Sequence, residues 1–99
     1  MNMQNLMAQA QKMQKDIMKK KEELEKQEFV GKSQFVEVVL YGNKKIKSIS
    51  INIENSIDAD DKEMLEDLVK IAFEDALRQV DSKTEEVMGV YGNSLNGLF

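Results

Sequence analysis

The sequence contains no His, no Cys and no Trp. Their absence excludes an imidazole base, every thiol nucleophile, disulfide bonds, and the His and Cys ligands of zinc and iron–sulfur sites. The longest unbroken apolar run, Val38 to Tyr41, has four residues, far fewer than the roughly 20 that span a bilayer. We therefore expect a cytoplasmic protein that is not an enzyme and has no cofactor, no bound metal, no membrane partner and no small-molecule substrate.

Proline is also absent and glycine is scarce, with 5 residues among 99. Charged residues make up 32% of the chain and hydrophobic residues 41%, a balance that favours one folded, helix-rich domain. The charges are segregated along the chain. Residues 1–50 hold 10 Lys and 6 acids, and residues 51–99 hold 4 bases and 12 acids, which gives +4 against −8. This asymmetry fits either a protein that binds a polyanion with one end or a solvated, salt-bridged surface.

An uninterrupted run of helix-forming residues predicts a first helix over residues 1–28. Its apolar residues recur at spacings of three and four and form a narrow stripe, as in a helix that pairs with another helix. The stripe consists of Met3, Leu6, Ala10, Met13, Ile17 and Leu24. The helical face opposite the stripe is basic and carries Lys12, Lys15, Lys19 and Lys26.

Residues 29–54 predict a three-stranded antiparallel sheet with strands at 29–31, 34–41 and 47–53. A two-residue Gly42-Asn43 turn would place Val38 opposite Lys47, whereas a four-residue loop ending at Lys45 places Val38 opposite Ile49. We favour the longer loop because it gives one wholly apolar face, made of Val36, Val38, Leu40, Ile49, Ile51 and Ile53.

A second helix is predicted over residues 60–88, with Asp60 as its N-cap and Glu63 completing a capping box. Its broad apolar face is typical of a helix that packs on a sheet. The acids near its start do not match a calcium loop, because Glu63 falls where a Gly is required. Residues 1–90 thus form a single α+β domain of order α-β-β-β-α, and residues 89–99 are expected to be a flexible tail.

Three segments resemble the YbaB/EbfC family of bacterial nucleoid-associated proteins: Asn5 to Gln14, Lys45 to Ile51 and Asp61 to Leu68. The third segment is the most specific and continues into Ala72-Phe73 and Asp75-Ala76. The resemblance implies a homodimer that binds DNA with weak sequence preference and alters its conformation. The family usually carries several Gly between its first two strands, whereas here the predicted link is Lys32-Ser33.

The positions of the lysines predict which residues would contact the phosphates of DNA. These candidates are Lys12, Lys15, Lys19, Lys20, Lys21, Lys44, Lys45 and Lys47. The candidate dimer interface combines the helical stripe with the second face of the sheet, as Leu6, Ala10, Met13, Ile17, Leu24, Phe35, Val39 and Tyr41. The alternative function is a protein-interaction scaffold that acts through the coiled-coil helix and the acidic second helix.

Overall fold

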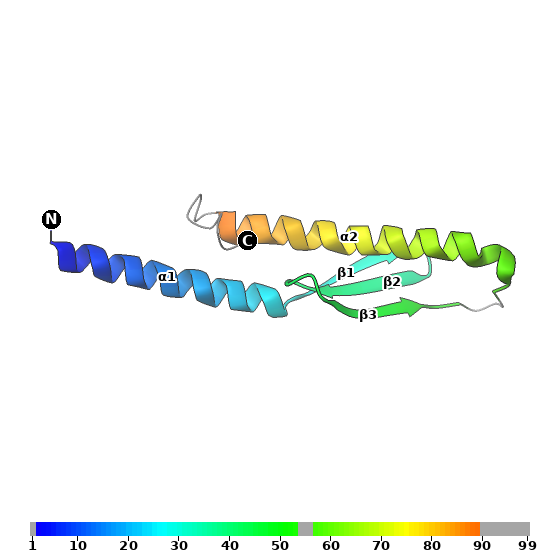
Figure 1. The fold of residues 1–99 in the computed structure, drawn as a ribbon, viewed down its shortest axis with the longest axis horizontal. Helices are drawn as coiled ribbons and strands as arrows, with labels where there is room; N and C mark the ends of the chain where they lie inside the picture. Colours follow the sequence, from blue (N-terminus) through cyan, green and yellow to red (C-terminus); the bar gives the residue numbers. More distant parts are fainter. Residues whose placement is uncertain (1, 54–56, 90–99) are drawn as a thin grey trace.

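The computed structural model describes residues 2–53 and 57–89, which form an elongated molecule with a long axis of 71 Å. Its elements follow the predicted order, with a long helix, three antiparallel strands and a second long helix (Figure 1). The α-β-β-β-α fold class is therefore confirmed. The segment predicted to be a tail lies outside the described residues except for its first residue, Gly89.

Helix α1 (Met3–Lys26) begins where the Asn2 side chain accepts a hydrogen bond from the backbone N–H of Gln4, at 2.9 Å. It ends two residues before the predicted boundary because Gln27 adopts an extended conformation. The Gln27 carbonyl then accepts a hydrogen bond from Gly42 N–H, also at 2.9 Å. The end of α1 is thus fastened to the hairpin loop that follows the second strand.

The sheet consists of β1 (Glu28–Ser33), β2 (Val36–Tyr41) and β3 (Ile46–Ile51), in the order β1-β2-β3. The predicted strand boundaries were wrong by one to two residues at several ends. In particular, Lys32 and Ser33 belong to β1, and the chain turns at Gln34 and Phe35. Gln34 supplies the turn geometry with a positive φ of 50°, a conformation that glycine adopts more readily.

The predicted register between β2 and β3 is confirmed. Val36 lies opposite Ile51 and Val38 lies opposite Ile49, across the four-residue loop 42–45. A bulge at the Val39/Leu40 step then shifts the pairing by one residue. A bulge bends the strand that carries the extra residue, so the loop can turn toward the end of α1.

Helix α2 (Lys62–Met88) follows a short 3₁₀ turn, η1 (Ala59–Asp61). The prediction of Asp60 as N-cap was wrong, because the capping box belongs to Asp58. The Asp58 carboxylate accepts a hydrogen bond from Asp60 N–H at 2.9 Å, and Asp58 N–H donates to the Asp61 carboxylate at 3.2 Å. Asp58 is extended (φ −110°), which is the conformation an N-cap residue requires.

The core lies between α2 and the first two strands, which confirms that the second helix packs on the sheet. Val36, Val38 and Leu40 of β2 are fully buried in one cluster with Ala72 and Ala76 of α2. The small alanine side chains let the helix approach the sheet closely. Strand β3 lies outside this cover, so its isoleucines on the predicted apolar face remain exposed.

Candidate nucleic-acid interface

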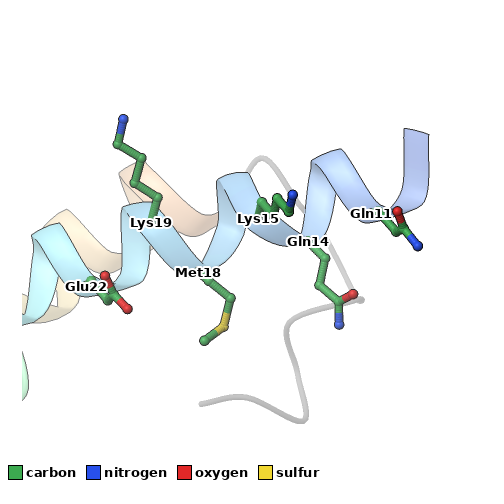
Figure 2. Close-up of a pocket in the computed structure, with 6 residues that line it drawn as sticks. All are labelled: Gln11, Gln14, Lys15, Met18, Lys19 and Glu22. Atoms are coloured by element: carbon green, nitrogen blue, oxygen red, sulfur yellow. The ribbon is translucent and has the colours of Figure 1, made fainter. Parts of the chain in front are cut away.

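The outer face of α1 carries exposed lysines, three of which were predicted to contact DNA. Lys12, Lys15 and Lys19 lie on the side of the helix opposite Ile17 and Leu24, which are buried in the core. None of the three forms an ion pair with any carboxylate in the described part of the chain. Figure 2 shows Lys19 projecting from α1 on the side away from Met18. We call these three residues the α1 lysine face.

The other two lysines predicted on this helix are placed differently. Lys21 lies 3.9 Å from the Glu25 carboxylate, and its side chain is only 28% exposed. Both Lys20 and Lys21 interact with other groups of the protein. They add positive charge to the helix, but their ammonium groups are less available than those of the α1 lysine face.

The lysines of the β2–β3 hairpin are mostly neutralised by carboxylates. The Lys44 ammonium lies 3.3 Å from Asp81 of α2. Lys47 forms an ion pair with Glu28 of β1, and the hydrogen bond and charge of Glu28 raise the pKa of Lys47 above its ordinary value of 10.5. Of the predicted hairpin lysines, only Lys45 is exposed without an ion pair to a described residue. The free positive charge therefore gathers on α1.

The residues predicted for the dimer interface fall into three environments. Ile17 and Leu24 are 8% and 3% exposed, because they pack into the core of the chain itself. Farther along α1, the stripe residues Leu6, Ala10 and Met13 are exposed. The remaining members, Phe35, Val39 and Tyr41, are half-buried, with Phe35 in the β1–β2 turn and the other two on β2.

An apolar surface that was not predicted to be an interface lies on β3. Ile49 and Ile51 are 49% and 43% exposed, although they share a sheet face with the buried Val38 and Val36. The neighbouring flank of α2 adds the half-buried side chains of Val69, Phe73 and Leu77. Alternating apolar residues identified this face of the sheet, but alternation does not indicate which strands a helix covers.

Two further observations limit the chemistry of the described residues. They contain no group of three or more acidic side chains that could hold a metal ion. Neither of the described long helices is long and apolar enough to cross a membrane. The lysine face and the apolar β3 surface are thus the chemically distinctive features of the described residues.

Comparison with known proteins relates this chain to a class of DNA-binding proteins. Residues 1–95 match the model of the YbaB/EbfC DNA-binding family. A nucleoid-associated protein of Ligilactobacillus salivarius is 43% identical over 100 residues, covering 99% of this chain and 95% of the relative. A nucleoid-associated protein of Streptococcus agalactiae is 42% identical over 97 residues, covering 96% and 97%. The chain belongs to the YbaB/EbfC DNA-binding family.

Proposed function

We propose that the protein is a nucleoid-associated protein that binds duplex DNA as a homodimer and alters DNA conformation. It binds mainly through phosphate contacts and with weak sequence preference, in the nucleoid of the cytoplasm, and it is not an enzyme. The observation that carries the proposal is the α1 lysine face, which presents three ammonium groups along one side of a projecting helix, none of them in an ion pair with a described residue. Family membership supports DNA as the ligand.

The weak sequence preference follows from the type of basic residue. Specific readout of guanine relies on the planar, bidentate guanidinium of Arg. The sequence has a single Arg, Arg78, which lies 3.6 Å from Asp75 on the acidic helix α2. Lysine ammonium groups act as point charges that attract phosphates of any sequence. Contacts from the α1 lysine face would therefore position the protein without selecting bases.

The proposed homodimer is supported by the apolar surface of β3. A second copy would bury Ile49 and Ile51 together with the flank of α2 that contains Phe73. Burying apolar area contributes roughly 25 cal/mol per Å², and exposed apolar patches often mark interaction sites. The opposite edge of the sheet is less suited to pairing. There, Asp75 accepts a hydrogen bond from Lys32 N–H, and Gln79 donates to the Val30 carbonyl.

A charge-neutralising variant tests the DNA site directly. Changing Lys12, Lys15 and Lys19 together to Gln removes the α1 lysine face while keeping side chains that suit a helix. We expect this variant to lose at least about tenfold in affinity for random-sequence duplex, because each lost phosphate contact also loses its released counterions. Fluorescence anisotropy with a labelled duplex of random sequence at low salt measures the change.

The matched control changes Lys62, Lys70 and Lys83 of α2 to Gln, which alters the net charge by the same amount. This control should bind with nearly the affinity of the wild type. Equal losses in the two variants would mean that only the total charge matters, and the α1 lysine face would not be the site. Absence of DNA binding by the wild type would instead favour the protein-interaction scaffold.

A further inference from the structure

The first half of α1 projects beyond the remainder of the described fold (Figure 1). Residues 2–16 are all exposed, although the apolar stripe that continues into the buried Ile17 and Leu24 passes through Met3, Leu6 and Met13 in this half. No other described segment buries these three side chains. A short isolated helix is only marginally stable in water, so a cover for this stripe would stabilise the projecting helix.

The distribution of charged residues along the sequence indicates which segment could bury the exposed apolar stripe of α1. Nearly a third of the residues are charged, yet two long runs contain no charged side chain, residues 1–11 and residues 87–99. The first run forms the start of α1. The second begins in the last turn of α2 and includes the ten residues 90–99, which follow the described part of the chain. Two segments without charged side chains can associate without burying an unpaired side-chain charge.

The end of α2 lies where such a segment could reach the stripe. Met88 is 3% exposed and belongs to the same buried cluster as Ile17 of α1. Helix α2 runs antiparallel to α1, so the chain approaches residue 90 while heading toward the N-terminus of α1 (Figure 1). Along α1, Met3 lies about 21 Å from Ile17 at about 1.5 Å per residue. Ten extended residues span about 33 Å, which is sufficient.

We propose that residues 90–99 bind the exposed apolar stripe of α1 in the same chain. The segment contains five apolar residues that can cover Met3, Leu6, Ala10 and Met13, namely Val90, Tyr91, Leu95, Leu98 and Phe99. Because the stripe lies opposite the α1 lysine face, the bound segment leaves the lysines accessible. The inference concerns a different face of α1 from the proposed DNA site and does not depend on DNA binding.

Hydrogen exchange of the full-length protein tests this contact. Changing Leu95, Leu98 and Phe99 together to Ser should speed exchange of the backbone amides of residues 6–16 by at least about tenfold, because local opening of the uncovered helix becomes easier. Amides of β2 should keep their rates. The control, Asn93→Ser with Asn96→Ser, alters two polar residues of the same segment and should leave all rates unchanged. Equal exchange of α1 in all three proteins would overturn the proposal.

A spin label distinguishes binding within one chain from binding between chains. The protein has no Cys, so Ser94→Cys gives a single attachment point for a nitroxide. In an isotope-labelled, spin-labelled chain, the amide signals of Leu6 and Met13 should broaden, and the triple Ser change should restore them. Isotope-labelled chains without a nitroxide, refolded with spin-labelled chains of natural isotope content, should show no broadening. Broadening in that mixture would overturn binding within the chain and place the segment on a second copy.

Discussion

At the scale of single residues, Gly31 controls how closely the sheet approaches the second helix. A Cβ atom at this position would lie 2.0 Å from the carbonyl oxygen of Ala72 and 2.5 Å from the amide nitrogen of Ala76. Both atoms belong to the backbone of α2, so they cannot rotate away as a side chain could. The sequence placed Gly31 in a strand, but it could not reveal this contact with a helix far along the chain.

We predict that Gly31→Ala destabilises the protein by roughly 3 kcal/mol, because the added methyl group forces α2 away from β1. Urea denaturation followed by circular dichroism measures the change in the free energy of unfolding. The control is Gly89→Ala, where an added Cβ would meet the Glu85 Cγ at an ordinary 3.9 Å. This control should be neutral or stabilising by up to about 1 kcal/mol. Similar losses in both variants would contradict the close-approach explanation.

At the scale of elements, the order of the helices and strands and the β2–β3 register could be predicted from sequence. The spacing of apolar residues predicts both the element order and this register. Only the pairing of Val38 with Ile49 places the apolar side chains on one face of the sheet and the polar ones on the other. Boundaries and caps depend on local backbone angles. Asp58 and Asp60 are chemically equivalent N-caps in the sequence, and only the extended backbone at Asp58 decides between them.

For the candidate site, sequence alone could place Lys12, Lys15 and Lys19 on one helical face because their spacing follows the helical repeat. It could not predict that the hairpin lysines Lys44 and Lys47 are paired with carboxylates. Those carboxylates come from other elements, so the pairing depends on the tertiary arrangement. For the same reason, the sequence could not predict that α2 leaves β3 uncovered.

The two aspartates give a direct test of where the second helix is capped. Asp58→Ala should lower the free energy of unfolding by about 1 kcal/mol, because it leaves the Asp60 N–H without its acceptor. Asp60→Ala should cost no more than a few tenths of a kcal/mol, since its side chain accepts no capping hydrogen bond in the described structure. Thermal or urea denaturation measures both. A larger loss for Asp60→Ala would restore the prediction made from the sequence.

At the scale of the whole molecule, charge opposes the approach of the protein to DNA. The chain carries −4, so the proposed homodimer carries −8. Screening confines charge interactions to roughly 8–10 Å at physiological salt. DNA that binds at the projecting end of α1 is therefore attracted by the α1 lysine face, while its repulsion by the acidic helix α2 is screened. This arrangement requires the dimer to expose both lysine faces, which the β3 surface permits because it lies away from the N-terminal half of α1.

The β3 surface should control the oligomeric state. We predict that Ile49→Asp combined with Ile51→Asp converts a dimer to a monomer in sedimentation equilibrium at micromolar concentration, because carboxylates would be buried unpaired in the interface. Both residues are already about half exposed, so the protomer should still fold. The control, Ile71→Asp, alters an equally exposed residue one turn before Asp75, on the flank of α2 facing the β1 edge. A wild-type monomer, or a fully dimeric double variant, would contradict the proposed interface.

The salt dependence of DNA affinity tests the central claim, phosphate binding by the α1 lysine face, most directly. The slope of log affinity against log salt is measured between about 50 and 200 mM for the wild type and for the Lys12, Lys15 and Lys19 triple Gln variant, on two duplexes of unrelated sequence. The wild type should give the same steep slope on both duplexes. The triple variant should give a slope shallower by about 0.9 for each phosphate contact removed. An unchanged slope in the triple variant would contradict the assignment of these lysines to the DNA interface.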